Sequence, residues 1–97
     1  MMEKALDLLK KKPVLVEYAV INEDESGAIT VLNPVTGKVF VINDVGRRVL
    51  ELSDGTRSLE EIIATITKEF AQAEPDLVRR DIQDFVAGCL AAQLLRI

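Results

Sequence analysis

The apolar positions divide the chain into β-like segments followed by helix-like segments. Three stretches rich in β-branched and apolar residues come first, at 14–21, 28–32 and 38–42. Three stretches with apolar residues at helical spacing follow, at 44–52, 59–70 and 76–93. This order predicts an α+β, winged helix-turn-helix-like fold, in which a three-stranded antiparallel sheet is followed by three helices.

Residues with special backbone or capping roles stand between these segments. Asn43 precedes the first helical stretch, where its side-chain oxygen can accept a free helix N–H. Gly55 can take the left-handed conformation that ends this helix, and Ser58 with Glu61 forms a capping box for the next one. Residues 33–37 (NPVTG) predict the hairpin loop before the third strand.

The amino-acid composition indicates a water-soluble globular protein. Hydrophobic residues make up 48% of the 97 residues and charged residues 29%, which is typical of a globular fold. The length predicts one domain over 1–97, with residues 1–12 as an N-terminal arm or short helix before Pro13.

The net charge and the number of cysteines indicate which kinds of partner and which cellular compartment to expect. The net charge of −4 disfavours binding to nucleic acid, which usually requires a basic face. No apolar run is long enough to span a membrane, and no secretory signal is visible. Because the chain has one cysteine, it cannot form an internal disulfide, and we expect a cytoplasmic protein without nucleic-acid or membrane partners.

The chain has no histidine, which excludes histidine-dependent triads, metal ligands and proton shuttles. Cys89 has no second thiol to form a zinc site or a redox pair, and we expect it to be an inert core thiol. We therefore predict a protein that is not an enzyme and that holds no metal or cofactor.

The third helical stretch has a core stripe with two chemically different flanks. One flank carries small residues, Gly88 and Ala92, together with Asp81, and suits close approach by another helix. The other flank either lines a binding groove or is a solvated helix edge. This second flank consists of Arg79, Gln83, Val86 and Leu90.

The third strand is apolar on both faces, although one face of a small sheet is ordinarily polar. Phe40 and Ile42 can face the helices, which leaves Val39 and Val41 on the other face. An uncovered edge of this kind either accepts another chain as an added strand, or is covered by the N-terminal segment or by a homodimer partner.

Several motifs in this order resemble the PqqD family of pyrroloquinoline quinone biosynthesis. The chain has a strand ending in Ile-Asn at 42–43, a short helix, the Asp-Gly turn at 54–55 and the helix start S-x-x-E-I at 58–62. The later segment 81–95 (DIQDFVAGCLAAQLL) is similar to the family's D-V-x-x-F-L-x-x-L ending.

The resemblance implies a recognition element for ribosomally made, modified peptides. Such domains bind the leader segment of a precursor peptide in a groove between the third strand and the third helix. In the quinone pathway the family member presents its precursor to a radical S-adenosylmethionine enzyme and catalyses no step. The implied strand edge is Lys38, Val39, Phe40, Val41 and Ile42, and our helical-wheel inference for the opposite wall is Arg79, Gln83, Val86 and Leu90.

The chain departs from the family pattern in three places. Cys89 replaces a usual leucine, Gln93 replaces a usual glycine, and the arm at 1–12 is an addition. We expect the loss of the glycine to lengthen the last helix slightly. The arm leaves open whether its contact is a modifying enzyme, another protomer or nothing.

Two other functions compete with the peptide adaptor. A winged-helix transcriptional regulator would use Arg79, Arg80 and Gln83 on the third helix, but Asp76, Asp81 and Asp84 oppose them. A structural dimerisation module would use the apolar strand edge for self-association. The adjacent Arg47 and Arg48 on the first helix are either solvated or attract acidic residues of a peptide.

Overall fold

A computed structural model describes residues 8–97 of the chain. The strands are β1 (Val14–Leu15), β2 (Val20–Glu23), β3 (Ile29–Asn33), β4 (Lys38–Ile42) and β5 (Leu95–Arg96). The helices are α2 (Asp44–Leu52), α3 (Leu59–Glu69) and α4 (Pro75–Ala91). Of the predicted arm at 1–12, residues 1–7 lie outside the described part of the chain, and residues 8–10 form a helical turn.

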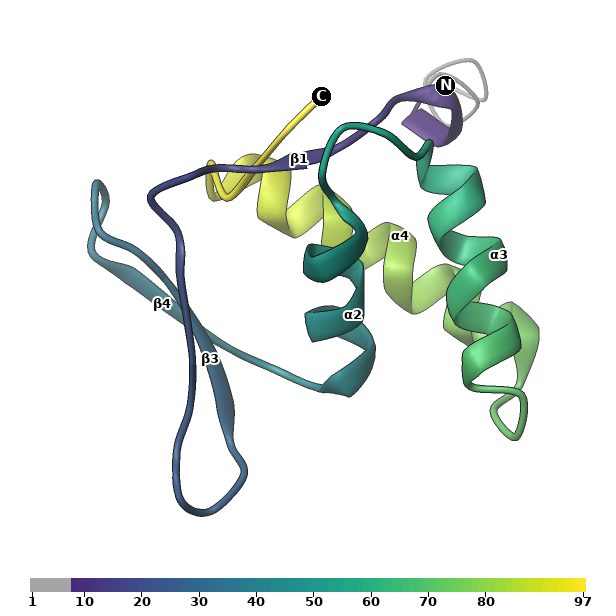
Figure 1. Cartoon of the computed structure of the whole chain (residues 1–97), viewed down its shortest axis with the longest axis horizontal. Coiled ribbons are helices and arrows are strands. Elements are labelled where there is room, and N and C mark those ends of the chain that lie inside the picture. The colour runs from purple at the N-terminus through teal and green to yellow at the C-terminus, as the bar shows by residue number, and fades with distance from the viewer. Residues whose placement is uncertain (1–7) are drawn as a thin grey trace.

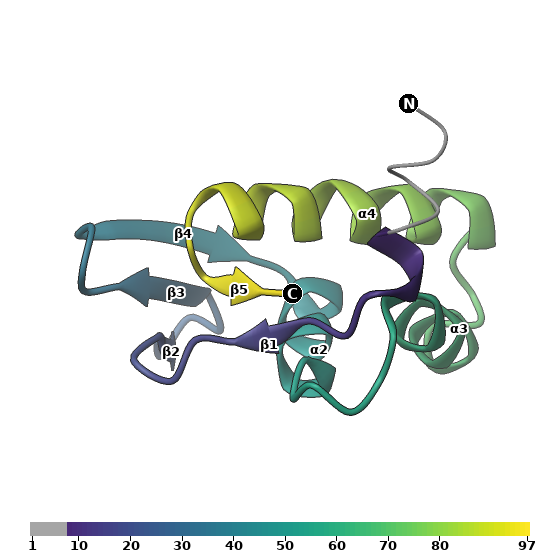
Figure 2. The ribbon, with the colours of Figure 1, turned by 90° about the horizontal axis from the view of Figure 1, so that it is seen from above.

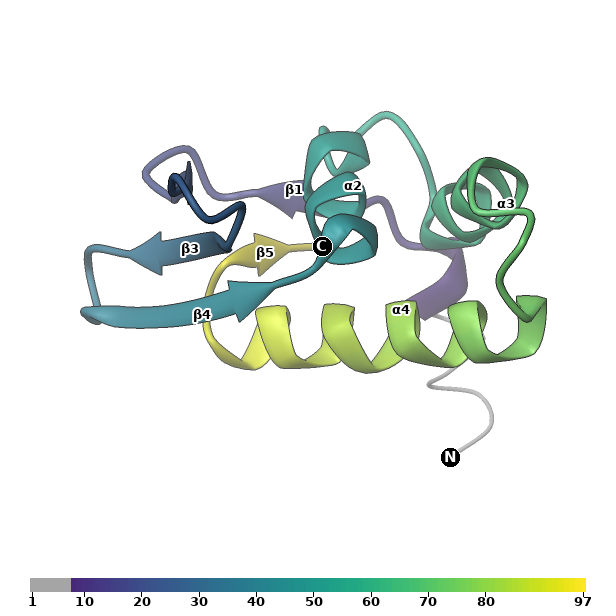
Figure 3. The same cartoon turned by 90° about the horizontal axis from the view of Figure 1, so that it is seen from below.

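The elements separate into a sheet and a helical group that lie side by side (Figure 1). Strands β2, β3 and β4 form an antiparallel sheet in sequence order, with Val31 opposite Phe40 and Thr30 opposite Val41. The predicted three-stranded antiparallel sheet followed by three helices is confirmed. Helix α4 runs alongside β4 in two further views (Figures 2 and 3), and this arrangement positions the site described below.

The prediction of one strand over 14–21 is wrong, because this segment forms two short strands in different sheets. Strand β1 pairs with β5, with Leu15 opposite Leu95, whereas β2 pairs with β3. Between them, buried Val16 donates its N–H to the carbonyl of Leu94 at 2.9 Å, and Ala19 donates to the carbonyl of Val16 at 3.1 Å. This turn redirects the chain from the helical group toward the sheet.

The helix boundaries follow the predicted caps. The Asn43 side chain accepts a hydrogen bond from the N–H of Gly46 at 2.8 Å. Ser58 and Glu61 form the expected reciprocal capping box, at 3.1 and 2.8 Å. Gly55 takes a φ of 84°, in the left-handed region that glycine adopts at little cost.

One apolar core joins the sheet to the helices. Its members come from β3 and β4, from all three helices and from the C-terminal segment. The largest fully buried apolar side chains are Val31, Val49, Leu50, Leu59, Ile62, Ile66, Ile82, Val86 and Leu94. Because β3 contributes its inward side chains to this core, one face of the sheet packs against the helical group.

The fully buried side-chain amide of Asn33 links the β3–β4 hairpin to the end of α4 by hydrogen bonds. Its Nδ2 donates to the carbonyls of Ala92 at 3.0 Å and Gln93 at 3.3 Å. Its Oδ1 accepts from the backbone N–H groups of Val35 at 3.0 Å and Thr36 at 3.4 Å. The side chain therefore orders the hairpin loop and sets the position of β4 relative to α4.

Helix α4 ends in a Schellman motif despite lacking glycine at the turning residue. Gln93 has a φ of 61°, and its N–H donates to Leu90 at 3.1 Å. The N–H of Leu94 donates to Cys89 at 2.8 Å, which completes the motif. The expected lengthening of this helix is wrong: α4 ends at Ala91, because the glutamine adopts the left-handed conformation that a glycine would adopt.

Substituting Asn33→Ala is expected to lower the free energy of unfolding by about 2 kcal/mol, because buried backbone groups lose their partners. Urea unfolding measures this difference. The control Asn22→Ala removes an exposed amide from β2 and is expected to change stability by less than about 0.5 kcal/mol. Equal effects of the two substitutions would contradict the role of Asn33.

Substituting Gln93→Gly is expected to raise the free energy of unfolding by about 1 kcal/mol, because the left-handed conformation is costly for a residue with a Cβ. Gln83→Gly, inside α4, should instead lower it by about 1 kcal/mol. Opposite changes in the free energy of unfolding of the two variants, measured by thermal unfolding, would show that the effect comes from the backbone conformation at Gln93 and not from a general tolerance of glycine. A destabilised Gln93→Gly variant would disprove the assignment.

Candidate functional site

Strand β4 is an edge strand whose outer side is unpaired within residues 8–97. It pairs with β3 alone, so its other row of N–H and C=O groups has no strand partner in this part of the chain. Val39 is 58% exposed, Phe40 38% and Val41 77%, whereas Ile42 is buried. Lys38 begins the strand and is exposed.

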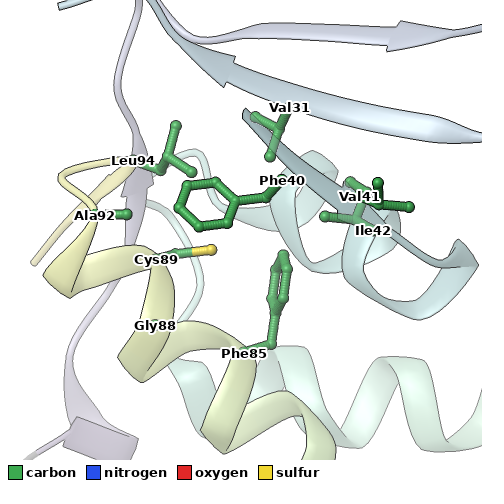
Figure 4. Close-up of a pocket in the computed structure, with 9 residues that line it drawn as sticks. All are labelled: Val31, Phe40, Val41, Ile42, Phe85, Gly88, Cys89, Ala92 and Leu94. Atoms are coloured by element: carbon green, nitrogen blue, oxygen red, sulfur yellow. The ribbon is translucent and has the colours of Figure 1, made fainter. Parts of the chain in front are cut away.

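An apolar cleft of about 180 Å³ lies between β4 and α4. From the sheet it is lined by Val31, Phe40, Val41 and Ile42, and from α4 and the following turn by Phe85, Gly88, Cys89, Ala92 and Leu94. Figure 4 shows the ring of Phe40 reaching from β4 toward Cys89 and Leu94, with Phe85 rising from α4 toward the end of β4. Phe40 and Ile42 border the cleft, as expected if they face the helices, but Val41, which the sequence analysis placed on the other face, borders it as well.

The wall of this cleft differs from the one predicted from the helical wheel. None of Arg79, Gln83, Val86 and Leu90 lines it, and Val86 is fully buried in the core. Helix α4 instead turns its small-residue flank, with Gly88 and Ala92, toward β4. A helical wheel identifies the two flanks of a core stripe but cannot say which one borders the sheet, because that depends on how the helix is docked.

Phe85 owes its position to a glycine in α2. A Cβ placed on Gly46 would lie 3.1 Å from Cε1 and 3.2 Å from Cζ of Phe85. The aromatic ring therefore packs directly against the first turn of α2. Sequence reasoning did not place Phe85 at the site, and a glycine inside a short helix was the signal for this close contact.

A second, more open hollow of about 340 Å³ continues from the cleft beyond Phe85. Its remaining lining consists of Asn43, Val45, Gly46, Asp81 and Asp84. Both carboxylates are exposed, and no basic side chain of residues 8–97 lines this hollow. The groove as a whole therefore has an apolar part beside Phe40 and an acidic part beside Asn43.

Cys89 lies at the base of the cleft and is buried, as the sequence predicted. Burial raises the pKa of the Cys89 thiol to about 11. A thiol held in its neutral form contributes apolar contact surface and not a nucleophile.

The two adjacent arginines of α2 are engaged within the protein. Arg47 pairs with Glu23 of β2 and with Glu51. Arg48 donates two hydrogen bonds of 2.8 Å to the carboxylate of Glu69 on α3, and these hydrogen bonds lower the pKa of Glu69. These contacts join α2 to β2 and α3.

The fold and the cleft define a class of small α+β proteins in which an unpaired strand edge lies beside an apolar groove on a helix. The sequence profile described as "Coenzyme PQQ synthesis protein D (PqqD)" matches residues 29–95. The chain therefore belongs to the PqqD family, as the resemblance in its motifs suggested. No curated protein sequence matches the chain closely enough to count as a relative.

Solved structures with the same fold include three that are informative. TbiB1 in complex with the TbiA(beta) leader peptide is 25% identical, with a TM-score of 0.66 over 86% of this chain and 94% of that one. The PqqD truncation of PqqCD from Methylobacterium extorquens, described as a stand-alone recognition element, is 24% identical, with a TM-score of 0.68 over 88% of each chain. Lasso peptide synthetase B1 complexed with the leader peptide is 16% identical, with a TM-score of 0.68 over 89% of this chain and 99% of that one.

Two absences hold over residues 8–97. No helix in this range has both the length and the apolarity needed to cross a bilayer. No group of three or more potential metal-ligating side chains is found among these residues.

Thiol reactivity tests the buried position of Cys89. With a pKa of about 11 in place of the ordinary 9.0, the thiolate fraction at pH 7 falls about a hundredfold. Alkylation by iodoacetamide at this pH is expected to be slow in the folded protein and to accelerate in urea. The folded-state rate should keep rising with pH until about 11. Equal rates in the folded and unfolded protein would contradict burial of the thiol.

Proposed function

We propose that this chain is a non-catalytic adaptor that captures the leader segment of a ribosomally made precursor peptide as an added strand on β4. The observation that carries the proposal is the edge of β4, which pairs with no other strand within residues 8–97 and lies beside an apolar cleft on α4. Main-chain hydrogen bonds to Lys38–Ile42 would provide affinity, and side chains entering the cleft would provide specificity.

The alternation of side chains in a strand supports this arrangement. Every second residue of an added strand points toward the same face, so those residues would enter the space between Phe40 and Phe85. There they would cover apolar surface that water contacts in the free protein, which favours binding. The intervening residues would lie beside the exposed Val39 and Val41.

The family and its structural neighbours support the same function. Two of the neighbouring structures hold leader peptides, and a third is described as a recognition element. By this analogy the adaptor would present its peptide, in the cytoplasm, to a modifying enzyme. A radical S-adenosylmethionine enzyme of quinone-cofactor or modified-peptide biosynthesis is the candidate partner, and residues 1–97 would act as one peptide-recognition domain.

The chemistry of the cleft supports binding and not catalysis. Its lining consists of apolar side chains, one bare glycine and one thiol. Because burial raises the pKa of that thiol to about 11, the neutral form dominates at physiological pH. The cleft therefore offers a surface for side-chain packing without a poised acid, base or nucleophile.

Amide hydrogen exchange tests the added strand directly, using peptides selected on the intact protein from a random library displayed on phage. On binding, alternate amides of β4 are expected to exchange more slowly, because only alternate residues point their N–H to the free edge. Protection of these amides at high protein concentration without peptide would instead show that a second copy occupies the edge. Protection elsewhere, with β4 unaffected, would refute the proposal.

Removing the Phe40 ring is expected to weaken binding of a selected peptide about tenfold or more, because the ring supplies apolar surface to the cleft. Titration calorimetry on Phe40→Ala measures this loss. The matched control is Phe70→Ala at the end of α3, which removes the same group outside the cleft and should leave affinity unchanged. Equal affinities of wild type and Phe40→Ala would exclude the cleft as the binding site.

A further inference from the structure

We infer that the groove reads a two-residue pattern in its peptide: a bulky apolar side chain seated on Gly88 and a basic side chain two residues away, beside Asp84. This inference rests on the proposed function and specifies the peptide that the site prefers. It is carried by a glycine without an internal role, by two aromatic side chains and by the charge of the adjoining hollow.

Two of the chain's five glycines lie inside helices, and their surroundings differ. A Cβ on Gly46 would crowd Phe85, so packing within the protein explains that glycine. Among residues 8–97, a Cβ on Gly88 would meet nothing within 4 Å, although Gly88 lines the cleft. Since glycine is less favourable than alanine inside a helix, internal packing gives no reason for its presence.

The bare backbone at Gly88 instead leaves room for a large group that arrives from outside. Phe40 borders this space from β4, and Phe85 borders it one turn earlier on α4 (Figure 4). A phenylalanine, leucine or similar side chain from the added strand would pack between these rings and against the helix backbone. A side chain at position 88 would occupy part of that space.

The neighbouring hollow has the opposite chemistry. Asp81 and Asp84 line it, and its other lining residues are Asn43, Val45, Gly46 and Phe85. Neither carboxylate takes part in an ion pair among residues 8–97. A lysine or arginine of the peptide would complement this charge, whereas an acidic residue would be repelled.

The spacing of the two features matches an extended strand. Gly88 lies four residues after Asp84, which corresponds to about 6 Å along a helix. Residues i and i+2 of a strand point to one face and lie about 6.8 Å apart. A peptide running alongside α4 would therefore place one side chain at Gly88 and the next on that face at Asp84.

Repeating the phage selection on variants tests this pattern. Peptides selected on the wild type are expected to carry a bulky apolar residue with lysine or arginine two positions away, on one consistent side. Selection on Asp84→Lys should replace that basic residue with glutamate or aspartate. Glu74→Lys, which makes the same charge change at a residue without a side-chain cap hydrogen bond, should leave the pattern unchanged.

Binding affinities of altered peptides test the two positions of the pattern separately. For a selected peptide, replacing the basic residue by glutamate should weaken binding about threefold, as expected for a solvent-exposed ion pair. Replacing its bulky residue by alanine should weaken binding about tenfold or more. In Gly88→Leu this second loss should disappear, because the leucine occupies the space, whereas Ala87→Leu on the exposed side of α4 should preserve it.

The outcomes distinguish the inference from the function on which it rests. Selected peptides that protect β4 amides but share no such pattern would overturn the inference and leave the adaptor function intact. The same holds if the pattern persists unchanged in Asp84→Lys and Gly88→Leu. Failure to select any peptide that protects β4 would overturn both.

Discussion

The buried side chain of Asn33 is the interaction on which the site depends. It forms hydrogen bonds both to the loop that follows β3 and to the carbonyls at the end of α4. The cleft lies between two elements that come from distant parts of the chain, and their separation determines whether a strand fits. A single amide with four hydrogen bonds holds that separation at one end, because leaving the buried groups unpaired would be costly.

The other end of the groove is defined by packing between α2 and α4. Phe85 rests on Gly46, and this contact places an aromatic ring between the apolar cleft and the acidic hollow. The salt bridges of Arg47 and Arg48 then tie α2 to β2 and to α3. Exposed ion pairs contribute little stability individually, so the positions of the helices are fixed mainly by the apolar core and by the helix caps.

An unpaired apolar edge is normally an aggregation hazard, and proteins usually cover it or place charges on it. Here Lys38 stands at the start of β4, but Val39, Phe40 and Val41 follow without a charge. A protein that receives a peptide strand must keep such an edge accessible. The protein can tolerate this edge because its own stability comes from the apolar core that the sheet shares with the helices, in which Val31 and Ile42 are buried.

Local chemistry in the sequence was sufficient to predict most elements of the fold. The caps at Asn43 and Ser58, the glycine turn at Gly55 and the apolar periodicity act within a few residues, so the helix boundaries and the order of strands could be predicted from them. The edge strand at 38–42 was predictable because its apolar residues exceed what one buried face requires. Family resemblance in the motifs agreed with these local signals.

Tertiary structure alone decided which surfaces meet. The segment at 14–21 divides into two strands because the N–H of Val16 donates to the carbonyl of Leu94, and β1 pairs with the distant strand β5. The flank of α4 that borders β4 could not be chosen from a helical wheel, since both flanks adjoin the same core stripe. Asn33 looked like a turn residue until its partners on α4 were placed beside it. The sequence by itself determined the elements and the exposed edge through short-range interactions. The walls of the groove depend instead on contacts between residues about forty to sixty positions apart, such as Gly46 with Phe85 and Asn33 with Ala92, for which a local pattern carries no signal.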